Sequence, residues 1–416
     1  MNPIKMTSSQ KRYSSLYKNN PDTVLNNLTF SLKIEGQLDI EKFITALKVV
    51  LSNRALLNST CDLDNFQYLF QEFDHEIRIN LIDIPLLEDP NQFVVEQARE
   101  QNNLSFNVQN DPLYRITVLR KSNNLAYLTL TFIHTIADGI GIHYFIKDVF
   151  SQYECELDNI SSLNLGENNL SLRAESELNK VNQNLDVWWN QYFSQSSLEF
   201  GHVSEFEQVG QFVTEFKILE KFSLNMFTSK LLEILIKADT ELKLAVKGSY
   251  FIKEVLGNRD HTVKDFNCYI DLIPYIIIPN IKDSVLLDNI IHNRQKAKEN
   301  KIPYWDIVEN VSNTFYSHPY GIANIEINVR FLEFGPKFGN LDLTTSILKE
   351  SLFQTGGIMS DICLVADCFD KSAGTIALYY NKSRFSPEVI KNIFKKMLNL
   401  INGDYFFRDI QYSIKG

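Results

Sequence analysis

The stretch Leu125–Tyr153 constrains the fold more than any other part of the chain. Its first half alternates apolar with β-branched or aromatic residues, and this period of two predicts a strand over 125–133. Its second half spaces apolar residues three and four apart, which predicts a helix. Between the two halves lie His134, Asp138 and Gly139. A histidine therefore ends a strand, and a carboxylate and a glycine precede a helix.

Similar patterns predict a mixed α+β protein. Alternation predicts strands on both sides of this stretch, chiefly at 27–36, 212–219, 249–256 and 325–329. Helical spacing predicts helices over 40–54, 90–101, 228–246, 287–300 and 385–400. Asp39 is expected as the N-cap of the first of these helices, because its carboxylate can accept an unpaired backbone N–H.

Composition excludes several classes of protein. The 416 residues are 44% apolar, enough for a large core and more than one lobe. A net charge of −10 argues against a nucleic-acid partner. The five cysteines have no metal-ligand spacing, so a reduced cytoplasmic protein without a metal site is expected. The N-terminus lacks an apolar signal region, and the longest apolar run, at 270–279, is too short to span a membrane.

The HxxxDG pattern at a strand-to-helix junction resembles the active-site segment of the chloramphenicol-acetyltransferase-like acyltransferases, which include the condensation domains of nonribosomal peptide synthetases. Segments at 36–39, 106–116, 266–274 and 325–329 resemble further condensation-domain motifs in the same order. This collinear order favours a condensation domain, and we expect a stand-alone one because no adenylation or carrier segment is recognised in the 416 residues. The resemblance implies an α+β fold of two chloramphenicol-acetyltransferase-like lobes forming a V with a central tunnel. We expect the lobes at residues 1–165 and 166–416.

The motif suggests three roles. A histidine titrates near neutral pH, so His134 is expected to face the acceptor nucleophile as a general base or as a positioning acceptor. Asp138 is expected to hold the loop through an arginine and to cap the following helix, rather than to act as a base. Gly139 is expected to let the backbone approach the thioester, and its N–H could assist an oxyanion.

Further site residues follow from the resemblance, each with a simpler alternative. The family's arginine partner of the aspartate corresponds to Asn58 here, so Arg115 is the replacement candidate, or else a surface arginine on a strand. Asn328 is a candidate for the tunnel lining, or makes a cross-strand hydrogen bond. Ser9 is a substrate-binding candidate in a segment resembling the family's SxxQ opening, or belongs to a helix cap. Ile133 replaces the first histidine of the family's HHxxxDG and points the opposite way from His134.

The function implied is transfer of an acyl group from the phosphopantetheine thioester of a carrier protein to an amine or hydroxyl acceptor. The expected partners are acyl or peptidyl carrier proteins supplied in trans and a small-molecule acceptor. No tightly bound cofactor is expected, and the protein is expected to be a monomer. The first alternative is a coenzyme A-dependent acyltransferase that uses acyl-coenzyme A. The second is a catalytically inactive domain that recruits carrier proteins.

Overall fold

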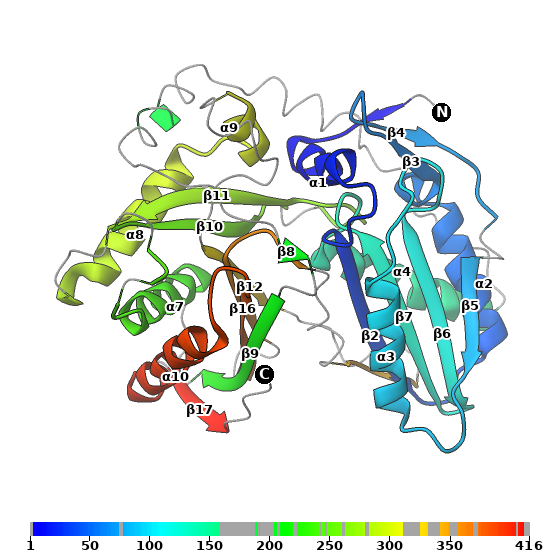
Figure 1. Ribbon diagram of the computed structural model, residues 1–416. Coiled ribbons are helices and arrows are strands. Elements are labelled where there is room, and N and C mark those ends of the chain that lie inside the picture. The colour runs from blue at the N-terminus through cyan, green and yellow to red at the C-terminus, as the bar shows by residue number, and fades with distance from the viewer. Residues whose placement is uncertain are drawn as a thin grey trace. The chain divides into compact units, whose positions relative to one another are not determined.

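The α+β class is confirmed by the computed structural model (Figure 1). It describes residues 3–74, 78–158, 188–189, 191, 204–205, 209–218, 223–241, 243–245, 248–259, 263–278, 283–310, 325–331, 342–348, 357–368, 373–404 and 407–411.

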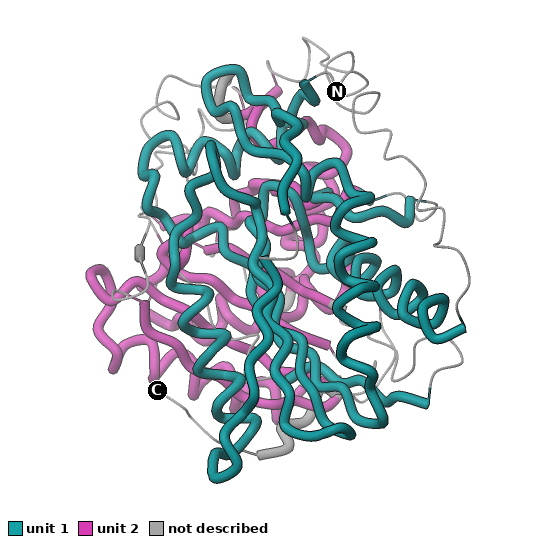
Figure 2. Tube along the Cα trace, turned by 90° about the vertical axis from the view of Figure 1, so that its right-hand side faces the viewer, with its two compact units in different colours: residues 1–180, 259–269, 334–356 teal, residues 181–258, 270–333, 357–416 magenta. Residues whose placement is uncertain are grey.

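The chain divides into two lobes (Figure 2). The N-terminal lobe comprises residues 1–180, 259–269 and 334–356, and the C-terminal lobe comprises 181–258, 270–333 and 357–416. The boundary expected between residues 165 and 166 lies outside the described residues. Two segments from the second half of the chain belong to the N-terminal lobe, so the C-terminal lobe is not one uninterrupted stretch.

The elements of the N-terminal lobe are β1 (Ile4–Lys5), α1 (Ser8–Asn19), β2 (Asn27–Glu35), α2 (Ile40–Ser52), the 3-10 helix Ala55–Asn58, β3 (Ser59–Asp62), β4 (Gln67–Phe70), β5 (Ile79–Asp83), α3 (Pro90–Asn102), β6 (Tyr114–Ser122), β7 (Leu125–Ile133), α4 (Gly139–Asp158) and β13 (Thr344–Ile347). The main sheet has the order β13-β2-β7-β6-β5, and a smaller sheet has the order β1-β4-β3.

The central strand β7 explains why the main sheet is covered on both faces. Its residues Leu128, Leu130 and Phe132 belong to the buried cluster that also takes apolar side chains from α2 and α4. Thr129 and Thr131 point to the opposite face, where α3 packs. Asp39 caps α2 as expected.

The elements of the C-terminal lobe are β8 (Ser204–Glu205), β9 (Val209–Ile218), α7 (Leu224–Ala238), β10 (Tyr250–Gly257), β11 (Ile270–Ile277), α8 (Asp283–Glu299), α9 (Tyr304–Asn310), β12 (Ile325–Phe331), β14 (Gly357–Ile358), β15 (Ile362–Cys368), β16 (Ala373–Asn381), α10 (Pro387–Gly403) and β17 (Phe407–Gln411). Its main sheet has the order β11-β10-β12-β15-β16-β9-β17.

A single apolar core holds the C-terminal lobe together. The helices α7, α8 and α10 cover one face of the sheet, and their apolar side chains form one buried cluster with those of the central strands (Figure 1). Arg294 of α8 ties this layer to β10 through paired hydrogen bonds to the buried Glu254 carboxylate. The predicted helix over 228–246 is corrected to Leu224–Ala238, because the Asp239 carboxylate accepts the backbone N–H groups of Lys243 and Leu244 instead of continuing the helix.

Candidate functional site

His134 directly follows the last residue of β7. Asn27, at the start of β2, pairs with Ile133, and the His134 N–H donates to the carbonyl of Asn26 at 2.7 Å. The chain then turns through an Ile136 N–H bond to the Ile133 carbonyl and enters α4 at Gly139. Because β7 is the middle strand of a packed sheet, the position of this histidine is fixed by the core of the lobe.

The imidazole of His134 is partly buried between two side chains. The Tyr13 ring of α1 stacks on it, with ring centroids 4.2 Å apart and planes at 9°. The Cys268 Sγ lies 3.7 Å from its Nδ1 atom. Burial lowers the pKa of His134 to about 4, against smaller opposing contributions from backbone hydrogen bonding and from the Asp138 charge. The ring is therefore neutral at pH 7, the form that can accept a proton.

Asp138 is a buried carboxylate, and both of its oxygen atoms accept hydrogen bonds. Its Oδ1 accepts the Gly141 N–H at 2.6 Å, which caps the start of α4, and also accepts the Arg259 Nη2 at 3.2 Å. Its Oδ2 accepts the Tyr269 N–H at 2.8 Å. A carboxylate that accepts this many hydrogen bonds is suited to holding a loop in place.

Arg259 and residues 263–269, which we together call the strap, complete this arrangement from the second half of the sequence. Arg259 donates to the carbonyls of Asp265 and Asn267 and to the Asp265 carboxylate, so it organises the strap as well as reaching Asp138. Asn267 accepts from the Gln10 side chain at 2.9 Å. The strap thereby connects the first turns of α1 and α4 to one buried ion pair.

Gly141 is required where the strap crosses α4. A Cβ atom at this position would lie 2.6 Å from the Asn267 carbonyl oxygen, closer than non-bonded atoms approach. At Gly139 a Cβ atom would meet no atom within 4 Å. The role of Gly139 in letting the backbone approach a thioester stays a prediction.

Arg115 lies elsewhere than the sequence analysis expected. It pairs in register with Thr131, so its side chain points to the α3 face of the sheet. There it donates to the carbonyl of Gln101 in the last turn of α3 and to those of Leu104 and Ser105 after the helix, and it lies 3.6 Å from the Phe106 ring centroid. Burial lowers the pKa of Arg115 to about 10. The cation that neutralises Asp138 is Arg259.

The remaining candidates are spread over both lobes. Ser9 is a partly buried residue in the first turn of α1, whose N-cap is Thr7. Asn58 donates to carbonyls at the end of α2, including that of Leu51 at 2.8 Å. Asn328 lies on β12 of the C-terminal lobe, where it pairs with Val365. The substrate-binding roles of Ser9 and Asn328 stay predictions.

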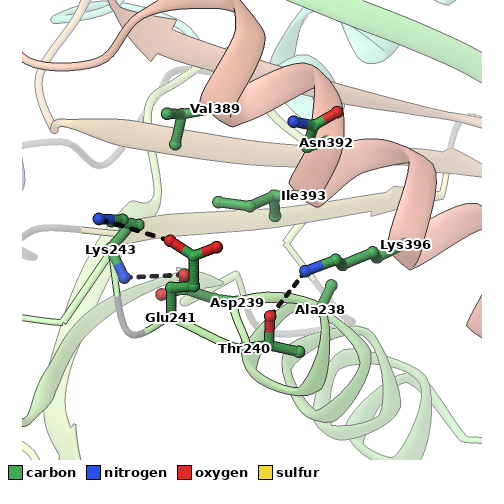
Figure 3. Close-up of a pocket in the computed structure, with 9 residues that line it drawn as sticks. All are labelled: Ala238, Asp239, Thr240, Glu241, Lys243, Val389, Asn392, Ile393 and Lys396. Carbon is green, nitrogen blue, oxygen red and sulfur yellow. Dashed lines mark hydrogen bonds and ion pairs between the residues drawn. The ribbon is translucent and has the colours of Figure 1, made fainter.

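A cavity of about 70 Å³ lies in the C-terminal lobe, between the end of α7 and α10 (Figure 3). Lys396 donates to the Thr240 hydroxyl at 2.6 Å across it. None of the predicted site residues lines this cavity.

Two kinds of feature are absent from the described residues. No cluster of three or more histidine, cysteine or acidic side chains is placed there to hold a metal ion. None of the helices described is both long and apolar enough to cross a membrane.

Comparison with known proteins identifies the family. The profile of the Condensation domain family matches residues 2–215, about half of the chain. The fold resembles that of the starter condensation domain of rhizomide synthetase RzmA in a mutant complex with C8-CoA and Leu-SNAC, at a TM-score of 0.78 and 13% identity, covering 100% of this chain and 98% of that one. The X-domain in complex with OxyB from teicoplanin biosynthesis matches at a TM-score of 0.73 and 14% identity over 98% and 95% of the two chains.

Relatives with curated descriptions are much longer proteins. Bacitracin synthase 3 of Bacillus licheniformis is 24% identical over 152 residues, which are 36% of this chain and 2% of the relative. Gramicidin S synthase 2 of Aneurinibacillus migulanus is 21% identical over 194 residues, 47% of this chain and 4% of the relative. The chain thus spans a few per cent of the length of these relatives.

The chain belongs to the condensation-domain family of nonribosomal peptide synthetases. Its fold is the family's pair of chloramphenicol-acetyltransferase-like lobes. Members of this family are typically acyltransferases that act on thioester substrates.

Three parts of the candidate site were missed from the sequence: Arg259, Asn267 and Tyr13. The one local signal was Gly141, a second glycine inside a predicted helix. A glycine there costs about 1 kcal/mol of helix stability relative to alanine, so its presence indicates a close contact at that position.

Proposed function

We propose that the chain transfers an acyl group from the phosphopantetheine thioester of a carrier protein to an amine or hydroxyl acceptor. The observation that carries the proposal is the neutral imidazole of His134 at the end of β7, beside a loop that is locked by the Asp138–Arg259 pair. Such a ring can accept a proton, and its surroundings keep it in place.

The proposed reaction balances without a further reactant. The acceptor nitrogen or oxygen attacks the thioester carbonyl while His134 takes its proton, and a tetrahedral oxyanion forms. The C–S bond then breaks, the proton passes to the leaving sulfur, and an amide or ester and a free pantetheine thiol result. General-base assistance of this kind contributes roughly 10²–10⁴-fold, and holding both reactants together contributes more.

Asp138 has a positioning role in this proposal. Its carboxylate is occupied by the N–H groups of Gly141 and Tyr269 and by Arg259, so it would act by fixing the loop rather than by moving protons. Gly139 opens α4, and its N–H is the candidate for assisting the oxyanion.

Coenzyme A is the alternative donor. The rhizomide domain that shares this fold is described in complex with C8-CoA, so a coenzyme A thioester is a reasonable second substrate to test. The pantetheine arm is common to both donors, and the reaction at the thioester is the same.

The test is intact-mass analysis of a loaded carrier protein with a mixed panel of amines and alcohols, run in parallel with the same acyl group on coenzyme A. Wild type should deplete the carrier thioester, and His134→Ala should lose this activity. His143→Ala is the matched control, because His143 is another partly buried histidine and lies in α4, outside the motif.

Depletion of acyl-coenzyme A alone would replace the carrier-dependent proposal by the coenzyme A-dependent one. The absence of His134-dependent turnover with either donor would leave the recruitment of carrier proteins as the leading account.

A further inference from the structure

The ring stacked on His134 belongs to a side chain that the sequence does not single out. Tyr13 lies in α1, far from the HxxxDG motif in sequence, and is only 3% exposed. Its ring is nearly parallel to the imidazole, at 9°, with centroids 4.2 Å apart. At this distance the Tyr13 ring packs against one flat face of the imidazole, and this contact restricts rotation of the imidazole about χ2.

One buried residue holds both partners of the stack. Asn26 is 0% exposed and directly precedes β2. Its side-chain Nδ2 donates to the Tyr13 carbonyl at 2.7 Å, and its backbone carbonyl accepts the His134 N–H at 2.7 Å. The backbones of Tyr13 and His134 are thus both fixed to Asn26, so the two rings keep a constant separation.

Cys268 limits the edge of the same imidazole. Its Sγ lies 3.7 Å from Nδ1, and the following Tyr269 N–H is bonded to Asp138. The His134 ring is therefore confined on one face by Tyr13 and at one edge by the strap. The two contacts come from segments of the N-terminal lobe that lie far apart in the sequence.

We infer that Tyr13, held by Asn26, is a positioning residue that sets the plane of the His134 imidazole. This inference rests on the proposed function, because it assigns the stack a role in aiming the base at the acceptor. A catalytic group must be held within about 0.5 Å and 10–20° of its productive geometry. A displacement of about 1 Å can reduce the rate by about 10²-fold. The ring, rather than the hydroxyl, is the part of Tyr13 that contacts the imidazole.

The test compares Tyr13→Leu with Tyr13→Phe. Leucine fills much of the space but provides no flat face, so kcat should fall about 10- to 100-fold while KM stays within about twofold. Phenylalanine keeps the ring and should restore kcat. Tyr17→Leu is the matched control, because Tyr17 lies one turn further along the same helix, is equally buried, and does not stack on His134.

A readout independent of turnover is the proton NMR shift of the His134 ring, assigned by comparison with His134→Ala. A stacked tyrosine shifts this signal upfield, so it should move downfield in Tyr13→Leu and keep its place in Tyr13→Phe and Tyr17→Leu.

The outcomes separate the two proposals. If wild type is inactive with every donor, the proposed function fails, and the NMR shift still reports whether Tyr13 holds the ring. If Tyr13→Leu keeps wild-type kcat in an active enzyme, or if Tyr17→Leu loses as much, Tyr13 has no positioning role and the inference is overturned.

Discussion

The protonation of His134 links one residue to the stability of the whole lobe. Its pKa is about 4 in the folded chain and about 6.5 in an unfolded one. Between these values the unfolded state binds more protons, so the free energy of unfolding rises with pH in this window. Stability is lost as pH falls from about 6.5 through about 4, by on the order of 3 kcal/mol over the full window.

We expect His134→Gln to remove this pH dependence. Urea unfolding of wild type and variant should be compared at pH 7.5, 6 and 5. The difference between the two proteins isolates this residue, because all other groups titrate in both. If the difference in unfolding free energy between wild type and His134→Gln does not change with pH, the lowered pKa of His134 is wrong.

The same pKa sets the expected pH profile of acyl transfer. A base with a pKa near 4 stays deprotonated down to about pH 5, so kcat/KM should show no loss between pH 8 and pH 5.5 attributable to this group. Rates with a carrier-bound or coenzyme A thioester at constant ionic strength would measure this. An inflection of kcat/KM near pH 6.5 in wild type, absent from the slow residual turnover of His134→Ala, would contradict this expectation. It would show that the His134 ring is solvated during turnover.

The Asp138–Arg259 pair should show strong energetic coupling. Removing one partner of a buried charged hydrogen bond leaves the other uncompensated, and such bonds contribute about 1.5–3 kcal/mol. A double-mutant cycle of Asp138→Asn and Arg259→Gln, followed by urea unfolding, should give a coupling energy of about 1–3 kcal/mol.

The matched cycle uses Arg115→Gln. Since Arg115 bonds to carbonyls at and just after the end of α3 and not to Asp138, its coupling to Asp138 should stay within about 0.5 kcal/mol. Equal coupling in the two cycles would contradict the assignment of Arg259.

At this scale the sequence predicts what is local and misses what is distant. Periodicity within thirty residues predicts that His134 lies at the end of a strand and that Asp138 lies at the start of a helix. The structure has both residues in these places. Arg259 is separated from Asp138 by 121 positions, and no periodic pattern connects them. Arg115 is a candidate from a segment that resembles a family motif and leads into the strand paired with β7, but its register with Thr131 turns its side chain to the other face of the sheet.

Among the elements, α1 depends most on a residue with two tasks. The Gln10 Oε1 accepts the Thr7 N–H at 2.9 Å, which completes a capping box, and its Nε2 donates to Asn267 of the strap at 2.9 Å. A glutamate would keep the first bond and place an oxygen against the Asn267 oxygen.

We expect Gln10→Glu to lower the free energy of unfolding by about 1–2 kcal/mol, because the hydrogen bond from residue 10 to Asn267 is replaced by two acceptor oxygens that face each other. Hydrogen exchange of the 263–269 amides should increase. The control is Thr7→Ser, which keeps the cap and should change neither measurement. Normal protection of the strap in Gln10→Glu would argue against this link.

The lengths of the elements were predicted best where capping residues are visible. Asp39 and Asp89 each cap the helix that was expected to follow. The helix expected over 228–246 ends at Ala238, because Asp239 is buried and bonds forward to two N–H groups and to the Tyr250 hydroxyl. In the sequence, an aspartate inside a helical pattern neither favours nor excludes the continuation of the helix. Only its hydrogen-bond partners in the folded structure show that the helix ends there.

For the molecule as a whole, the net charge predicts how salt would affect the proposed encounter with a carrier protein. The chain carries a net charge of −10, and an acidic carrier protein would be repelled at long range. In the proposed reaction kcat/KM should therefore rise as NaCl is increased from 20 to 300 mM, since salt screens this repulsion.

An uncharged acyl-pantetheine donor provides the control, because its rate should change little over the same range. A rate with the carrier donor that falls with salt would indicate attraction by a local basic surface instead.

The two-lobe α+β fold was predicted from the order of motifs, and the folds of related domains confirm it. The predicted V and central tunnel stay predictions. The chain's path was harder to foresee, because 259–269 and 334–356 return to the N-terminal lobe. Hydrophobic patterning reports which residues are buried but not against which lobe they are buried.

The return of β13 has a consequence for how the protein is synthesised. β13 covers the outer edge of β2, where Thr344 pairs with Glu35. A ribosome adding ~5–20 residues per second needs roughly 15–60 s to translate the chain from Glu35 to Thr344. Through that interval the nascent N-terminal lobe has an unpaired strand edge that any other strand can join. Arg259 also emerges well after Asp138, so the lobe that carries His134 reaches its final structure only when most of the polypeptide has been translated.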